Sequence, residues 1–252
     1  MKKIVSLLAA ACLLMGAAVS SQAQTAPEEE AVQISSYTNT TFLKAQESLE
    51  SKETLNRQDL EQMEELYTVT SEPVDEEYRV YYLKAKEPLA RAVYSDGSEV
   101  NEYSTRAVLT RTKEDVDGSL SVVMWSEMRY ETKQYVESTW WGGTNVNTGY
   151  RITLSSGLIK SFGERYGRNY GTRCIQVGEN LETKQVQRFE KSYRWGDRIV
   201  GDKMTFYPGF SGYSACEYNG TIGTDVYVDV SHNGSTYSTF KIEIREGNIP
   251  NV

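Results

Sequence analysis

The sequence predicts a mainly β chain: an antiparallel β-sandwich, or an open barrel, preceded by a short α-helical N-terminal segment. Three observations lead to this class. Apolar and polar residues alternate over long stretches, Gly, Asn and Asp residues separate those stretches, and helical spacing is confined to one region, residues 40–67. A period of two buries one face of a strand and leaves the other in water. Many short strands with regular turns are typical of sandwiches and barrels.

The first residues, 1–23, have the three parts of a secretory signal peptide. Two lysines follow the initiator Met, residues 4–19 form an apolar run, and Ser21-Gln22-Ala23 is a small-x-small cleavage site. We therefore expect cleavage near Ala23 and a secreted, extracellular mature protein.

Two alternatives to a cleaved signal remain open. The apolar run could stay as an N-terminal anchor, although it is short for a stable membrane span. Cys12 could carry a lipid, but three alanines precede it, and an apolar remainder would then begin the mature chain.

Charge excludes some partners. Without residues 1–23, 229 of the 252 residues remain, with 25 basic and 35 acidic side chains and a net charge of −10. An acidic chain is a poor ligand for nucleic acid and for anionic membranes. We therefore expect no nucleic-acid partner and no stable membrane insertion. The length of the mature chain is enough for one β-domain with a hydrophobic core.

The N-terminal part is expected to hold two segments. Residues 24–39 are polar and acidic, which is typical of a disordered leader. Residues 40–70 form the helical segment, with apolar side chains about one turn apart and Asn56 as a plausible N-cap. The β-rich domain then covers residues 71–252.

Strands are expected where β-branched and aromatic residues alternate with polar ones. The expected strands are 78–83, 92–94, 98–103, 106–112, 120–130 and 150–154, with weaker candidates at 174–177, 186–195 and 204–207. The longest should place Met124, Met128 and Tyr130 on one face, together with Leu120 and Val122.

Residues 225–244 predict a hairpin. A two-residue Asn233-Gly234 loop would set Val228 opposite Thr239, whereas a three-residue loop that includes His232 sets Val228 opposite Ser238 and Val226 opposite Phe240. The second register joins the apolar faces, so we expect the three-residue loop.

Two cysteines, Cys174 and Cys216, remain in the mature chain. In an exported protein an even pair predicts a disulfide. The alternative is two buried thiols.

Known catalytic and cofactor motifs are absent from the sequence. His232 is the only histidine, which excludes a site built on two histidines, and it is expected to be a solvated turn residue. No cofactor and no metal ion are expected. The acids of residues 114–118 favour a hairpin turn over a calcium loop.

Aromatic residues gather in three stretches, which we expect to be surface loops. Trp140 and Trp141 are adjacent, so in a strand they face opposite sides and at least one should reach the surface or an edge. Residues 162–173 repeat an aromatic-Gly pair every four residues, with arginines between, and residues 207–213 form the third stretch. The candidate ligand-binding residues are Trp140, Trp141, Phe162, Arg165, Tyr166, Arg168, Tyr170, Tyr207, Phe210 and Tyr213. The alternative is that these rings fold back onto the sheet.

Exposed rings beside arginines can stack on sugar faces or on the side chains of a protein partner. The expected function is therefore non-catalytic recognition of a carbohydrate or a protein. Two rivals remain open: a secreted hydrolase that uses paired carboxylates, and a membrane-active, toxin-like protein.

Overall fold

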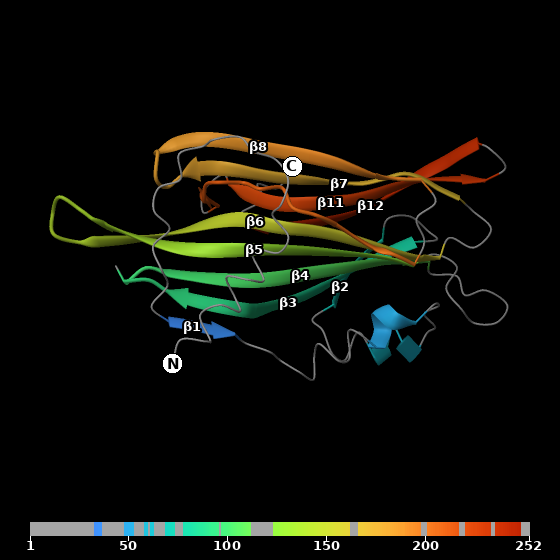
Figure 1. The fold of residues 1–252 in the computed structure, drawn as a ribbon, viewed down its shortest axis with the longest axis horizontal. Helices are drawn as coiled ribbons and strands as arrows, with labels where there is room; N and C mark the ends of the chain where they lie inside the picture. Colours follow the sequence, from blue (N-terminus) through green and yellow to red (C-terminus); the bar gives the residue numbers. More distant parts are fainter. Residues whose placement is uncertain are drawn as a thin grey trace, which may run out of the picture. The chain divides into compact units, whose positions relative to one another are not determined.

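Figure 1 shows the fold in a computed structural model of the chain. The structure describes residues 33–36, 48–52, 58–59, 61–62, 69–73, 78–95, 97–111, 123–161, 166–197, 201–216, 220–232 and 235–247. These residues belong to one unit, Ala31–Val252. The predicted signal peptide and the acidic turn at residues 114–118 lie outside the described residues. Among the described residues, no helix has the length and apolar character needed to cross a membrane.

The described chain is mainly β, as predicted. The strands are β1 (Gln33–Ser36), β2 (Val69–Pro73), β3 (Tyr78–Val93), β4 (Glu99–Arg111), β5 (Val123–Ser138), β6 (Thr144–Ser161), β7 (Tyr166–Asn180), β8 (Gln185–Gly196), β9 (Lys203–Phe206), β10 (Ser214–Ala215), β11 (Thr221–His232) and β12 (Ser235–Gly247).

The twelve strands belong to one open sheet, and every pair is antiparallel. The order is β1-β3-β4-β5-β6-β10-β7-β11-β12, with β2 also paired to β3, β9 to β6 and β8 to β7. Strand β10 has two residues and joins Tyr150 of β6 to Asn180 of β7 through Ser214. The predicted sandwich or barrel is not confirmed, because the hydrogen-bonded ladder defines a single sheet.

One core is filled by side chains from both sides of this β10 link. It comprises Ala107, Leu109, Met124, Met128, Tyr130, Ile152, Ile159, Tyr170, Cys174, Phe210, Cys216, Ile222, Val226, Val228, Phe240, Ile242 and Ile244. The predicted apolar face of the longest strand is confirmed for Met124, Met128 and Tyr130, which are fully buried. Leu120 and Val122 lie outside the described residues.

The hairpin of β11 and β12 joins its apolar faces, but not in the predicted register. Val226 lies opposite Ile242 and Val228 opposite Phe240, and all four side chains are buried. The three-residue loop was the wrong choice. The register shifts next to Val230, so that His232 ends β11 opposite Ser235 instead of lying in a loop. A bulge thus brings the apolar faces together while a two-residue connection is kept.

The N-terminal helical segment is only partly described. Residues 48–51 form a helical turn, and Leu49 is buried. Most of residues 40–70 lies outside the described residues, and β2 begins at Val69, inside that range. Strand β1 falls in the segment predicted to be a disordered leader. It pairs with β3 through main-chain bonds, which need no apolar pattern.

Two predicted turns or loops are strands. The stretch Ser155-Ser156-Gly157 was expected to follow a short strand, yet it lies within β6. Residues 166–173 were expected to form an irregular loop, yet they belong to β7, which pairs with β8 on one edge and β11 on the other. Small residues are needed here for close approach, since a Cβ at Gly171 would lie 2.6 Å from the carbonyl oxygen of Tyr193.

Candidate functional site

The hairpin of β5 and β6 extends beyond its neighbouring strands. Pairing of β4 with β5 ends at Val100 and Lys133, and β10 pairs with β6 only at Gly149 and Tyr150. Residues 134–148, which we call the aromatic arm, pair only with each other among the described strands. Figure 1 shows the arm projecting at the left of the view.

Two tryptophans occupy the tip of the aromatic arm. The turn is closed by the amide of Thr139, which donates to the carbonyl of Gly143 at 2.8 Å, and Gly142 adopts a φ of 82°. Trp140 is 91% exposed and Trp141 is 68% exposed. Their rings meet edge to face, with centroids 5.2 Å apart. Aromatic rings usually pack in the core, so a pair this exposed makes the tip a candidate interaction surface.

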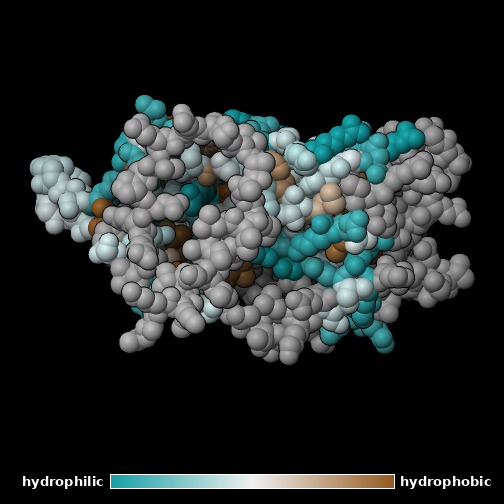
Figure 2. Space-filling model, in the orientation of Figure 1, coloured by the Kyte–Doolittle hydropathy of each residue, from teal (hydrophilic) through white to brown (hydrophobic). Residues whose placement is uncertain are grey.

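The outer part of the arm, residues 138–148, is uncharged, and the arm is partly apolar. No charged residue lies between Glu137 and Arg151. Val136 and Val146 face each other across the two strands and are 67% and 53% exposed. In Figure 2 the arm is a pale projection with hydrophobic surface near its base. A ligand that covers residues 138–148 therefore removes no charged side chain of the arm from water.

Charged and polar groups hold the base of the arm against the turn between β7 and β8. Lys184 pairs with Glu137, and the Tyr135 hydroxyl donates to Glu182 at 3.0 Å. The Tyr135 ring also meets the Tyr213 ring edge to face, with centroids 6.3 Å apart. These contacts fix the direction in which the arm leaves the sheet.

A groove lies beside the base of the arm. It has a volume of about 550 Å³, within the usual range of ligand sites. Its lining residues come from the turn between β3 and β4, from β5, and from the turn after β7: Gly97, Ser98, Glu99, Lys133, Gln134, Tyr135, Val136 and Glu182.

The predicted ligand-binding residues do not share one surface. Tyr170, Phe210 and Tyr213 are buried, as the alternative of rings packed on the sheet predicts, and they offer no exposed ring for a ligand. Tyr170 is in the core because β7 is a strand, and Tyr213 packs under Arg151, whose guanidinium carbon is 4.5 Å from the ring centroid.

The remaining candidates divide into exposed and undescribed residues. Tyr207 is half exposed and Arg168 is exposed. Phe162 and Arg165 lie outside the described residues, and the side chain of Tyr166 is not described.

The two cysteines are not joined, so the predicted disulfide was wrong. Cys174 and Cys216 are both buried thiols. Burial raises the pKa of Cys174 to about 11, despite opposing hydrogen bonds from Thr224 and other hydroxyls. Such a thiol is unreactive at neutral pH.

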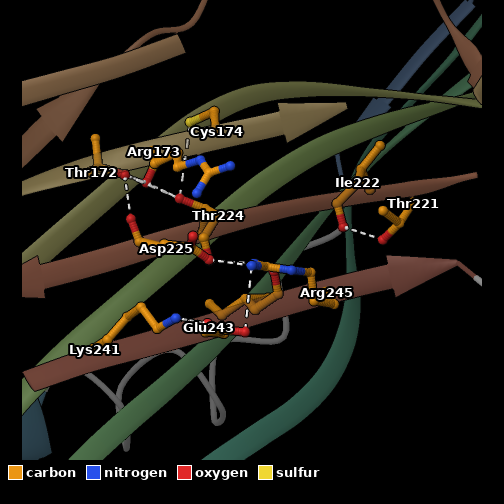
Figure 3. A network of polar contacts seen from close by, with 12 residues as sticks. Thr172, Arg173, Cys174, Thr221, Ile222, Thr224, Asp225, Lys241, Glu243 and Arg245 are labelled. Carbon is orange, nitrogen blue, oxygen red and sulfur yellow. Dashed lines mark hydrogen bonds and ion pairs between the residues drawn. The ribbon is translucent and has the colours of Figure 1, made fainter. Parts of the chain in front are cut away.

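Polar side chains cross the core next to Cys174. The hydroxyls of Ser155, Thr172 and Thr224 lie 2.5 to 3.1 Å from one another. The residue after Thr224, Asp225, has a buried carboxylate that pairs with Arg245 (Figure 3). The sequence pattern had placed Asp225 on the solvated face. These contacts join β6, β7 and β11.

A second buried charge, Glu127, lies on the outer face of β5. Its carboxylate accepts from Ser104, Arg106, Arg129, Ser156 and Lys203 at distances of 2.7 to 3.3 Å. Burial opposes ionisation, but the cations of Arg106, Arg129 and Lys203 hold the pKa of Glu127 well below its ordinary value. Because both oxygens of the Glu127 carboxylate accept hydrogen bonds, this side chain stabilises the sheet and does not serve as a free acid or base.

One pair of carboxylates stands face to face. Glu102 of β4 is the cross-strand partner of Glu131 of β5. Burial raises the pKa of Glu102, against the effect of Arg129 and with the help of the Glu131 carboxylate. Glu131 accepts from Arg151 and, at 2.8 Å, from the Tyr213 hydroxyl.

Metal and family comparisons add no further site. Within the described ranges, no cluster of three or more His, Cys, Asp or Glu side chains could hold a metal ion. No protein-family model, curated protein or solved structure matches the chain.

Part of this site could be predicted from the sequence. The Trp140-Trp141 pair was identified, and the uncharged stretch between Glu137 and Arg151 could have marked the arm. The groove was missed, because its walls come from three connections that are far apart in the chain.

Proposed function

We propose that this chain is an exported, non-catalytic recognition protein that binds a carbohydrate or a protein partner through the aromatic arm. The observation that carries the proposal is the exposure of Trp140 and Trp141, at 91% and 68%, on the tip of a projecting hairpin. Rings of this kind bind by stacking and by burial of apolar surface, with little loss of side-chain entropy.

The arm has a rigid support for this role. The single core joins strands from both sides of the β10 link, and we propose that the sheet folds over itself in the manner of a sandwich. Ser155 of β6 bonds to Thr224 of β11 at 2.5 Å, and Thr105 of β4 donates to Glu246 of β12 at 3.1 Å, which supports that arrangement. A binding element on a rigid sheet loses little freedom when the ligand binds.

Export is part of the proposal. Its support is the signal-like sequence of residues 1–23 and the acidic balance of the remainder. N-terminal sequencing of the secreted protein tests it, and the expected first residue is Gln24.

Binding is tested with the mature protein, residues 24–252, on immobilised polysaccharides and on extracellular host proteins. The double variant Trp140→Ala/Trp141→Ala should lose retention on the material that holds the wild type. Val186→Ala is the matched control, because Val186 is 81% exposed on β8 and is not part of the aromatic arm. Equal retention of wild type and double variant on every material would refute the role of the arm.

A second candidate function is hydrolysis by paired carboxylates. It is favoured by the opposition of Glu102 and Glu131, since two neighbouring carboxyls of which one has a raised pKa are a common acid-base arrangement. Turnover of glycoside substrates by the wild type, lost in Glu131→Gln, would support it. No turnover by either protein would leave recognition alone.

A further inference from the structure

The side chains of the groove at the base of the aromatic arm indicate which class of ligand fits there. Its walls combine hydrogen-bond acceptors with donors: the carboxylates of Glu99 and Glu182, the ammonium of Lys133 and the amide of Gln134. The side chain of Val136 adds an apolar wall at the side that leads to the arm.

The charges of the groove cancel. Glu99 is bound to Arg91, with Nε to Oε2 at 3.1 Å. Lys133 and Glu182 carry the other two charges, and the Lys133 ammonium lies 5.3 Å from the centre of the Tyr135 ring. Burial and the nearby Glu182 raise the pKa of Tyr135, so its hydroxyl stays neutral. The charges of these two carboxylates and two cations, Arg91 and Lys133, sum to zero. This favours a neutral ligand over an anion or a cation.

Several polar groups of the groove still have capacity to bond. The exposed Gln134 amide makes no hydrogen bond within the described part of the chain, and it offers both donors and an acceptor. The carboxylate of Glu182 accepts one bond from Tyr135 and has further lone pairs. Closely spaced donors and acceptors match hydroxyl groups, each of which donates one bond and accepts others.

The groove continues into the aromatic arm. Val136 lines the groove, and β5 runs on to Ser138, from which the turn continues to Trp140 at the tip, about 13 Å from Val136 if extended. Beyond Lys133 the β4-facing edge of β5 has no strand partner among the described residues, so its main-chain groups are open along this path. A chain-like ligand can therefore bond in the groove and stack at the tip.

We infer that the groove binds a neutral oligosaccharide, whose hydroxyls bond to Gln134, Glu182 and Lys133 while its further sugar units stack on Trp140 and Trp141. This rests on the proposed recognition function and gives it a ligand class and a second contact region. A peptide that adds a strand to the open edge of β5 is the competing occupant, and the experiment separates the two.

The experiment is isothermal titration of mature protein with neutral hexasaccharides of β-linked glucose, α-linked glucose and mannose, and with an oligogalacturonate of equal length as the anionic comparator. Gln134→Ala and Glu182→Gln are the groove variants. Gln134 is exposed and unbonded, so its variant should fold like the wild type. Gln185→Ala, an exposed amide on β8 that does not line the groove, is the matched control.

At least one neutral hexasaccharide should bind, and the oligogalacturonate should not. Each groove variant should bind about tenfold more weakly, because each removes one or two hydrogen bonds of the complex. Gln185→Ala should match the wild type.

Three results would overturn the inference. Equal binding of the anionic oligomer would contradict the neutral ligand. Unchanged affinity in both groove variants, with binding lost in Trp140→Ala/Trp141→Ala, would leave the arm as the whole site and the proposed function intact. Failure of every neutral sugar would exclude the oligosaccharide and leave a protein partner for the arm.

Discussion

Glu127 of β5 and Lys203 of β9 form a hydrogen-bonded ion pair, with Nζ 2.8 Å from Oε2, although 76 residues separate them. The same carboxylate also binds two arginines, Arg106 and Arg129, so three cations share one negative charge. Arg106 also binds Glu50 at 2.6 Å, which ties the N-terminal helical turn to the sheet.

Glu127→Gln should lower the free energy of unfolding by roughly 3–5 kcal/mol, because it removes the buried charge that binds three cations, of which Arg106 is itself largely buried. Urea denaturation of wild type and variant measures the difference. The control is Glu137→Gln, whose surface pair with Lys184 should contribute less than about 1 kcal/mol. A loss as small as the control's would show that Glu127 does not hold this face together.

The same carboxylate predicts a dependence on pH. Its pKa in the folded protein lies below its ordinary value of 4.5, so its stabilising effect is complete above that value and is lost as the pH falls further. The difference in unfolding free energy between wild type and Glu127→Gln should therefore shrink from about pH 5 to about pH 2. A constant difference over this interval would contradict the assigned ionisation.

Gly157 of β6 and Tyr170 of β7 predict a coupled pair of substitutions. A Cβ at Gly157 would overlap the Tyr170 hydroxyl and lie 2.8 Å from a methyl group of Val226. Gly157→Ala should cost about 1–3 kcal/mol of stability. The Tyr170 hydroxyl is buried and has no hydrogen-bond partner among the described residues, so Tyr170→Phe should be neutral or stabilising.

Combining the two tests the contact directly. In Gly157→Ala/Tyr170→Phe the overlapping oxygen is gone, so the double variant should lose less stability than the sum of the single changes. Some loss should remain, since the Val226 contact persists. Strict additivity would mean that the two residues do not meet as described.

The buried thiols predict the reactivity of the mature protein. Folded protein should not react with a thiol reagent at neutral pH, whereas in denaturant without reductant both Cys174 and Cys216 should react. Absorbance of the released reporter gives the count per chain. If no thiol reacts in denaturant, Cys174 and Cys216 are joined in a disulfide and the description of two free thiols is wrong.

The sequence predicted strands well where alternation had one buried face. Val226, Val228, Phe240 and Ile242 are buried as expected. Their register was missed because a bulge beside Val230 changes the count between the strands, and a bulge leaves no mark in the hydrophobic pattern.

Polar and glycine-rich strands were missed for a different reason. Ser155 and Gly157 suggest a turn by composition, yet they fill places where neighbouring strands approach closely. The same holds for Gly171 in β7. Burial of Tyr170 and Tyr213 also depends on strands distant in sequence, so the aromatic stretches could be found without knowing which rings face water. Among the predicted candidates whose side chains are described, Trp140, Trp141, Arg168 and Tyr207 are exposed.

The most direct test of the arm is acrylamide quenching of tryptophan fluorescence, with and without a polysaccharide or protein that the mature chain retains. Trp140 and Trp141 are exposed, whereas Trp125 is buried. In wild type, the bound partner should reduce quenching strongly, and in Trp140→Ala/Trp141→Ala quenching should be weak and unchanged by the partner. Quenching of the wild type that stays the same while the partner is bound would contradict recognition by the aromatic arm.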